Sequence, residues 1–172
     1  MADDQTWDLE ADVVVLGSGG AALTAAISAR DFGAKDVVIL EKSGMVGGTT
    51  AMSGGMLWIP NNPYQVAAGI EDSDEDIVAY LDSLAPGDLD PDTLMAFMEN
   101  GPELIRYFME KTPVRFHAYA DFPDYQPYMP GAKANGGRSL DNEAFPFDTL
   151  GKWAARVNPT KMADPVRGSL ME

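Results

Sequence analysis

Glycines and one acid give this chain its clearest chemistry, because their spacing is typical of a site for a phosphate-containing ligand. Within residues 11–41 a glycine-rich turn stands between two apolar runs, and Glu41 follows the second run. Gly17 permits a tight turn, Gly19 lets the backbone approach a pyrophosphate, and Ala22 keeps the third position small. A carboxylate at Glu41 can accept hydrogen bonds from ribose hydroxyls. The complete pattern predicts a dinucleotide site, whereas a glycine triplet alone would indicate only a turn.

The elements that must position these residues follow from the same stretch. Val13–Leu16 is a continuous apolar run, which is typical of a parallel strand buried on both faces. Residues 20–32 are predicted as a helix whose N-terminal N–H groups and positive dipole end face the phosphates, and Gly33 suits its C-terminal end. Val37–Leu40 is predicted as the second strand. The fold class is therefore α/β, with the βαβ start of a doubly wound, Rossmann-like parallel sheet.

The residues after Glu41 indicate which dinucleotide is bound. Residues 42–55, KSGMVGGTTAMSGG, combine paired glycines with small hydroxyls, which can bond phosphate or ring oxygens without filling the space of a cofactor. The alternative is an ordinary Gly/Ser/Thr surface loop. The stretch resembles the flavoproteins of the fumarate reductase and 3-ketosteroid dehydrogenase superfamily, in which a GG(T/S)-type turn and an S-G-G segment pass alongside the flavin. The resemblance implies FAD rather than NAD.

The candidate cofactor-binding residues offer backbone donors, small side chains or, in Glu41 and Lys42, a charge. They are Gly17, Ser18, Gly19, Gly20, Ala21, Ala22, Glu41, Lys42, Gly47, Gly48, Thr49, Thr50, Ser53, Gly54 and Gly55. In relatives with covalent flavin a histidine lies just before the threonine of the flavin loop. Gly48 occupies that place here, so the resemblance implies noncovalent FAD.

Two downstream segments narrow the resemblance. Residues 47–62 and 122–148 resemble the 3-ketosteroid Δ1-dehydrogenase branch, the second through its F-P-D-Y and G-R-S segments. The resemblance implies that Tyr125 is the catalytic candidate, lining the substrate cavity beside the flavin and supporting proton abstraction next to a ketone. A phenol suits this task because the proton is only weakly acidic and a base of high pKa is useful. The alternative for Tyr125 is a loop tyrosine that packs on the proline-rich segment.

Two further features of this region leave alternatives open. Residues 126–128, Gln-Pro-Tyr, replace a second tyrosine that often follows in the family, which leaves the steroid specificity open. Arg138 and Ser139 follow two glycines, and they orient the Tyr125 loop, shape the substrate cavity or form a plain turn.

The expected function is that of a noncovalent FAD-dependent oxidoreductase that introduces or reduces a double bond next to a carbonyl. The resemblance implies a steroid-like ketone or another enone as the substrate, and the electron acceptor is unknown. One alternative is a flavoprotein of the fumarate reductase or succinate dehydrogenase type acting on a small dicarboxylate. Such a site favours arginines and histidines, and this chain offers little of either. The other alternative is an FAD-binding fragment without activity of its own, completed by another chain.

Composition limits the partners and the chemistry. The formal net charge of −15 disfavours nucleic acid and anionic membrane surfaces as partners. Cysteine is absent and His117 is the single histidine, so the chain holds no thiolate or histidine metal cluster and no Ser-His-Asp triad. The acidic N-terminus does not resemble a signal peptide, and no apolar run reaches the length of a membrane span. A cytoplasmic protein is expected.

Between the two signature regions the sequence predicts helices. Ser73 and Asp90 are suited to be N-caps, and residues 100–102, Asn-Gly-Pro, are expected to interrupt the second helix and start a third. The acids on these helices are interpreted as a solvated face. Residues 114–119 alternate like a half-buried strand.

The domain organisation follows from these segments. Residues 1–72 are predicted as the FAD-binding segment, residues 73–112 as a helical segment of the flavin domain, and residues 113–172 as the start of a substrate region. The stretch after Gly151 is polar, with no closing strand or helix expected. Family members are considerably longer than 172 residues. The chain is therefore expected to be an incomplete N-terminal portion of a larger enzyme, or one piece of a split enzyme that a partner chain completes.

Overall fold

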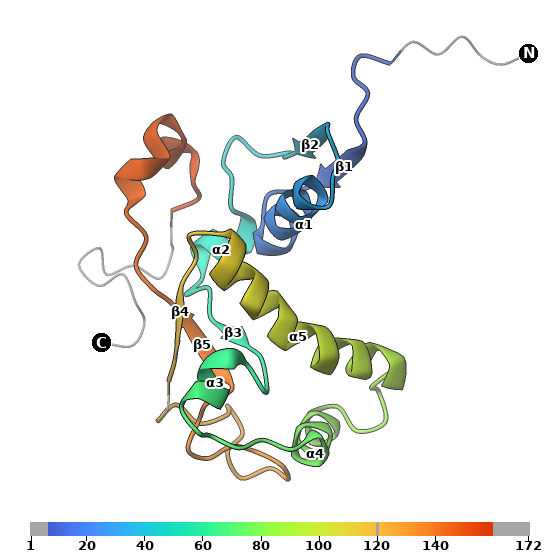
Figure 1. Cartoon of the computed structure of the whole chain (residues 1–172), viewed down its shortest axis with the longest axis vertical. Helices are drawn as coiled ribbons and strands as arrows, with labels where there is room; N and C mark the ends of the chain where they lie inside the picture. The colour runs from blue at the N-terminus through green and yellow to red at the C-terminus, as the bar shows by residue number, and fades with distance from the viewer. Residues whose placement is uncertain (1–6, 120, 160–172) are drawn as a thin grey trace, which may run out of the picture. The chain divides into compact units, whose positions relative to one another are not determined.

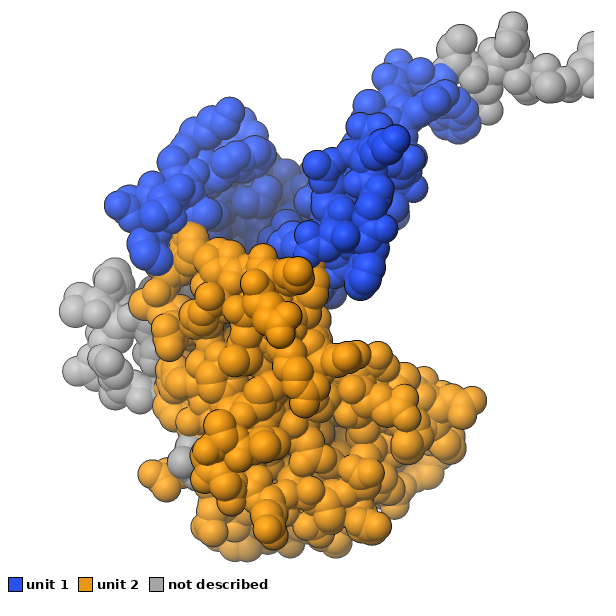
Figure 2. All heavy atoms as spheres, viewed as in Figure 1, with its two compact units in different colours: residues 1–54, 146–172 blue, residues 55–145 orange. Residues whose placement is uncertain are grey.

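The structure is a computed structural model that describes residues 7–119 and 121–159. In chain order the elements are β1 (Val13–Leu16), α1 (Gly20–Asp31), β2 (Val37–Leu40), α2 (Gly48–Met52), β3 (Leu57–Trp58), α3 (Pro63–Ala67), α4 (Asp74–Leu84), α5 (Pro91–Lys111), β4 (Phe116–Ala118), β5 (Ser139–Asn142) and the 3₁₀ helix η1 (Phe147–Arg156) (Figure 1). They belong to two compact units, one drawn from residues 1–54 and 146–172 and the other from residues 55–145 (Figure 2). The division into 1–72, 73–112 and 113–172 concerns the domains of the complete protein and stays a prediction.

The first unit contains the predicted strand, helix and strand. β1 and β2 are parallel, with Val13 opposite Val37, and α1 connects them. The helix ends where predicted, because Gly33 takes the left-handed conformation with φ of +104°. The carboxylate of Asp12 accepts the backbone N–H of Lys35 at 2.7 Å, which fixes the approach to β2. Local sequence signals therefore account for the succession of β1, α1 and β2.

The expected burial of β1 on both faces is wrong for this structure. Val15 is buried, but Val14 is 53% exposed and Leu16 is 77% exposed. On the neighbouring strand, Leu40 is 52% exposed. The reason is that the sheet has only two strands within the described residues, so part of its apolar surface has no cover.

The expectation that no helix or strand follows Gly151 is also wrong for the described residues. Residues on both sides of Gly151 form η1, and Gly151 itself is a kink with φ of 53° and ψ of −127°. Val157 then forms a parallel bridge with Val46, whose N–H donates to the carbonyl of Arg156 at 2.7 Å. These backbone bonds join residues far apart in sequence, so a local pattern could not predict them. Residues 160–172 lie outside the described part of the chain.

The second unit is organised around a three-stranded antiparallel sheet in the order β3-β5-β4. The predicted strand at residues 114–119 is confirmed as β4, with Phe116 buried and His117 exposed. The apolar core of the unit is formed by Ile59, Ile105, Phe116 and Leu140.

Both predicted N-caps of the helices in this unit are confirmed. The Ser73 hydroxyl accepts the N–H of Asp76 at 3.1 Å at the start of α4. The carboxylate of Asp90 accepts the N–H of Thr93 at 2.9 Å at the start of α5. These side chains satisfy backbone donors that the first helical turn leaves unpaired.

The predicted interruption at residues 100–102 is wrong, because α5 continues through Pro102 to Lys111. Gly101 and Pro102 are both buried, together with Met98 and Ile105 of the same helix. A proline inside a helix loses one hydrogen bond and strains the preceding turn. Burial of this face in the core offsets that cost, which tertiary packing commonly does to local propensity.

Candidate functional site

The candidate residues lie in both units, and those of the first unit gather at the N-terminus of α1. Gly17 leaves β1 with φ of +91° and donates its N–H to the carbonyl of Leu40 at 2.8 Å. Gly19 is the N-cap of α1 and makes no side-chain cap. Because Gly19 has no side chain, nothing of the cap residue itself stands between a phosphate and the first N–H groups of the helix.

The second glycine loop packs directly on this turn. The hydroxyl of Thr50 accepts the N–H of Gly20 at 3.0 Å. A Cβ placed on Gly48 would lie 3.2 Å from the Cα of Gly19, and Gly48 has φ of +53°. The two predicted cofactor loops therefore meet backbone to backbone, which is the close approach that requires glycine.

Ser18 connects both loops to Glu41. Its hydroxyl accepts the N–H of Gly47 at 3.0 Å and donates to Oε2 of Glu41 at 2.5 Å. The other carboxylate oxygen accepts the N–H of Ser43 at 2.9 Å. The hydrogen bonds from Ser18 and then from Ser43 hold the pKa of Glu41 below its ordinary value. A carboxylate has about four acceptor positions, so ionised Glu41 keeps capacity for a further donor.

This arrangement fits the pyrophosphate and ribose of a dinucleotide. It combines a helix N-terminus whose cap residue, Gly19, contributes no side chain, two glycine loops in contact and an ionised acceptor at the end of β2. Glycine, serine and glutamate at these positions were all predicted as ligands, but the link through Ser18 was missed. No sequence signal distinguishes a serine that bonds a ligand from one that bonds a neighbouring loop.

The remaining predicted ligands stay predictions. Lys42 is exposed, and the hydroxyl of Ser53 donates to the carbonyl of Thr50 at 3.1 Å. Gly54 is exposed. Gly55 lies in the second unit, where a Cβ would come within 2.9 Å of Oδ1 of Asn142. This glycine therefore has a reason within the chain to lack a side chain.

Tyr125 lies on a loop of the second unit and is 80% exposed. Its ring meets Phe122 edge to face, with the centroids 6.1 Å apart. Asp124, its neighbour in the F-P-D-Y segment, is buried instead. The segment therefore combines a buried carboxylate, that of Asp124, with an exposed phenol, that of Tyr125.

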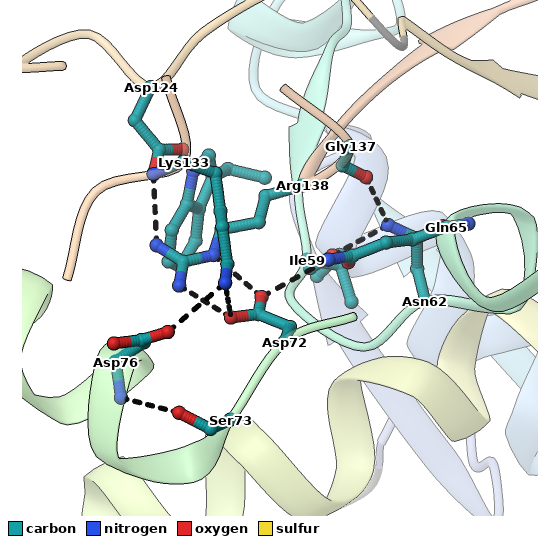
Figure 3. A network of polar contacts seen from close by, with 11 residues as sticks. Ile59, Asn62, Gln65, Asp72, Ser73, Asp76, Asp124, Lys133, Gly137 and Arg138 are labelled. Atoms are coloured by element: carbon teal, nitrogen blue, oxygen red, sulfur yellow. Dashed lines mark hydrogen bonds and ion pairs between the residues drawn. The ribbon is translucent and has the colours of Figure 1, made fainter. Parts of the chain in front are cut away.

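Arg138 is the centre of a buried ionic cluster in the same unit. Figure 3 shows its guanidinium between Asp72 and Asp124. Nε and Nη2 donate to the two oxygens of Asp72, each at 2.7 Å, and Nη1 donates to Asp124 at 2.9 Å. Lys133 lies 3.3 Å from Asp72 and 3.1 Å from Asp76. Of the three roles left open for Arg138, the contact with Asp124 supports orientation of the Tyr125 loop.

Asp72 and Arg138 each favour the charged form of the other. Burial raises the pKa of Asp72, but the hydrogen bonds from Arg138 and Gln65 and the nearby cations outweigh it, so the pKa is below its ordinary value. Burial likewise lowers the pKa of Arg138, but its bonds to Asp72 and Asp124 outweigh that and leave the pKa raised. Paired ions of this kind are costly to break, because the remaining charge stays buried.

Sequence reasoning missed Asp72 and Asp124 as partners of Arg138. Asp72 immediately precedes the N-cap of α4, in an acid-rich stretch, yet its side chain is fully buried. The partners are 66 and 14 positions from Arg138, so no local spacing identifies them.

A hollow of about 740 Å³ lies beside this cluster, lined among others by Asn61, Ile70, Asp72, Asp76 and Lys133. Tyr125 is not among its lining residues, so the hollow gives no support to a substrate site at the phenol. Among residues 7–119 and 121–159, no three His, Asp or Glu side chains are grouped to hold a metal ion. In the same part of the chain, no helix is long and apolar enough to cross a membrane.

Comparisons with known proteins give the context of these two sites. Residues 12–171 match the family described as FAD binding domain. A 4-oxocyclohexanecarboxylate 2-dehydrogenase of Sinomonas cyclohexanicum is 43% identical over 85% of this chain and 25% of its own length. A 3-oxosteroid 1-dehydrogenase of Mycobacterium tuberculosis is 35% identical over 95% of this chain and 29% of its own.

A solved structure is also similar. The 3-ketosteroid delta1-dehydrogenase of Sterolibacterium denitrificans, in complex with 1,4-androstadiene-3,17-dione, is 36% identical with a TM-score of 0.80, covering 87% of this chain and 26% of its own. The chain thus spans between a quarter and a third of the length of these relatives. It matches their FAD-binding region with a mixed α/β structure. The chain therefore belongs to the FAD binding domain family, which implies FAD as its cofactor.

Proposed function

We propose that the complete protein is a noncovalent FAD-dependent oxidoreductase that desaturates a cyclic ketone next to its carbonyl. The observation that carries this proposal is the cradle at the N-terminus of α1, whose donors and acceptor fit a dinucleotide. The names of both curated relatives support the substrate class. Each combines an oxo group with a dehydrogenation numbered two carbons away, at positions 3 and 1 or 4 and 2.

The cradle is proposed to hold FAD in a Rossmann-like βαβ unit. The N–H groups of the first turn of α1 after Gly20, whose own N–H is donated to Thr50, bind the pyrophosphate together with the loop of residues 47–50, and Glu41 accepts hydrogen bonds from a ribose. Lys42, Ser53, Gly54 and Gly55 complete the predicted set. When bound, FAD supplies the two-electron acceptor for the hydride that leaves the β-carbon of the ketone.

Noncovalent binding follows from the residues of the loop. Gly48 stands where a histidine would carry a covalent flavin, and a Cβ there would lie 3.2 Å from the Cα of Gly19. The sequence has no cysteine, and its single histidine, His117, lies on β4 of the second unit. Acid precipitation of the complete protein should therefore release all yellow colour into the supernatant. Flavin retained in the pellet would contradict this.

Tyr125 is the proposed catalytic residue. A proton must leave the α-carbon, which lies between the carbonyl carbon and the β-carbon, when the hydride leaves the β-carbon. A phenol oxygen is suited to accept this weakly acidic proton. The 80% exposure of Tyr125 leaves the phenol accessible to a substrate. Whether the substrate is a steroid or a smaller cyclic ketone is a matter for a substrate panel.

The test replaces Tyr125 in the complete protein. Tyr125→Phe should lower turnover of a 3-ketosteroid or a 4-oxocyclohexanecarboxylate with an artificial electron acceptor by roughly 10²–10⁴-fold, the usual contribution of a positioned acid–base group. Flavin content should not change. Tyr128→Phe is the matched control, because Tyr128 lies three residues along the same segment and is 100% exposed.

The panel also includes fumarate with a reduced dye. Fumarate turnover that is indifferent to Tyr125→Phe, with no activity on the ketones, would contradict the proposal and favour a fumarate-reductase-type flavoprotein. If Tyr125→Phe retains full activity on both ketones, Tyr125 has a structural role instead.

A further inference from the structure

Asp124, on one side of Tyr125, is held by three hydrogen bonds from different parts of the chain. Trp58 donates its Nε1–H to Oδ1 at 2.6 Å, and Arg138 and the N–H of Lys133 donate to Oδ2 at 2.9 and 2.8 Å. The Asp124 residue is only 2% exposed. Both carboxylate oxygens are therefore fixed, and the backbone that enters Tyr125 is fixed with them.

Gln126, on the other side of Tyr125, is held by Tyr80. Its backbone N–H donates to the hydroxyl of Tyr80 at 3.3 Å. Tyr80 comes from α4 and is 3% exposed. A buried tyrosine normally finds a partner for its hydroxyl, and here the partner is the backbone of this loop.

The groups that hold the two neighbours of Tyr125 also contact one another. The rings of Trp58 and Tyr80 are stacked with centroids 5.7 Å apart. The guanidinium of Arg138 lies 5.3 Å from the centroid of Trp58 and 5.6 Å from that of Tyr80. A planar guanidinium suits this place, because it stacks on aromatic faces while its fork donates to carboxylates.

We propose that Arg138, Trp58 and Tyr80 form a clamp that positions Tyr125 for its reaction. The clamp fixes the residue before and the residue after Tyr125, whereas Tyr125 itself is 80% exposed. An exposed loop side chain would otherwise sample many orientations, and a displacement of about 1 Å can cost about 10²-fold in rate. The three are positioning residues that act through Tyr125, so the inference rests on the proposed role of Tyr125.

The first test measures the clamp without any turnover. Tyr80→Phe in the complete protein removes the acceptor for the N–H of Gln126 and keeps the ring. Amide hydrogen exchange of residues 122–128 should become about fivefold faster, which corresponds to the loss of one hydrogen bond of about 1 kcal/mol. The matched control is Tyr64→Phe, because the Tyr64 hydroxyl accepts the N–H of Phe116 at the same 3.3 Å. That variant should leave exchange of residues 122–128 unchanged. Unchanged exchange in Tyr80→Phe overturns the clamp.

The second test asks whether the clamp acts through Tyr125. Tyr80→Phe should lower kcat by about three- to tenfold with little change in KM or flavin content, and Tyr64→Phe should not. In a Tyr125→Phe background the added Tyr80→Phe should have no further effect, because the group being positioned is gone. Additive losses would overturn the inference, since a merely structural role would be independent of the phenol.

A third variant tests the same dependence on Tyr125 by changing Arg138, the charged residue of the clamp. Arg138→Lys keeps a cation but loses the fork and the stacking. It should also lower kcat in the normal background and have no effect in the Tyr125→Phe background. If Tyr125→Phe alone leaves turnover unchanged, the proposed role of Tyr125 fails and with it the catalytic purpose of the clamp. The hydrogen-exchange result then still shows whether the clamp holds the loop.

Discussion

Gly19 and Gly48 lack a side chain for different reasons. At Gly48 the fold itself requires glycine, because a Cβ there would lie only 3.2 Å from the Cα of Gly19. Gly19 differs: a Cβ there would meet only the hydroxyl of Thr50, at 3.8 Å, and its φ of −71° is open to any residue. The folded chain therefore has room for a Cβ at Gly19, and the approach of a ligand is the proposed reason for a glycine there.

We expect Gly19→Val to abolish flavin loading of the complete protein while its circular dichroism stays the same. Gly44→Val is the matched control, because a side chain at Gly44 would meet nothing within 4 Å. Glu41→Gln should weaken loading less, because an amide oxygen still accepts from the ribose. The ratio of flavin to protein absorbance measures all three. Normal loading of Gly19→Val would place the cofactor elsewhere.

Helix α5 approaches the core of the second unit closely through a glycine. Its 21 residues pass through Gly101 and Pro102, both of which are buried. A Cβ on Gly101 would come within 3.2 Å of Cγ2 of Ile59, a member of the core of the second unit. The glycine that looks like a helix interruption in the sequence is therefore the point where the helix approaches the core closely.

A larger residue at this point should separate the helix from the core. Gly101→Val is expected to lower the free energy of unfolding by about 1–3 kcal/mol, the usual cost of overpacking. Ala96→Val, on an exposed position of the same helix, should cost only about 0.5 kcal/mol through helix propensity. Urea unfolding of the complete protein compares the two. Equal effects would mean that the contact with Ile59 is not what requires glycine.

At the scale of the whole molecule, apolar surface on the two-stranded sheet remains uncovered in this structure. Leu16 is 77% exposed, Val14 53% and Leu40 52%. Contiguous exposed apolar surface of this kind normally packs against further parts of a protein or drives association. The chain spans between a quarter and a third of the length of its relatives, which provides a source for such a cover.

The 172 residues alone should therefore bind FAD poorly and aggregate or melt without cooperativity. Leu16→Lys should reduce the aggregation, because it places a charge on the uncovered sheet. Val66→Lys, on α3 of the second unit and 62% exposed, should not. Light scattering measures the aggregation, and thermal melting measures the cooperativity of unfolding. A monodisperse monomer that melts cooperatively with stoichiometric FAD would contradict the expectation.

Local sequence predicted the elements and caps whose causes lie within a few residues. The β1-turn-α1-β2 succession and the N-caps at Ser73 and Asp90 are confirmed, because glycine torsions and side-chain caps are decided by neighbouring residues. The family and its FAD cofactor were predicted from the same local motifs. The roles of the individual ligands and of Tyr125 stay predictions.

Features that depend on contacts between residues distant in sequence could be found only in the tertiary structure. The continuity of α5 depends on the core that Gly101 and Pro102 enter, and local propensity alone favoured a break. The burial of Arg138 depends on Asp72 and Asp124, which the fold brings together from separate loops. A buried charge is stable only where its partners are already placed. Local sequence is therefore sufficient to predict the cofactor-binding motif, whereas the way in which the Tyr125 loop is held depends on the packing of the second unit.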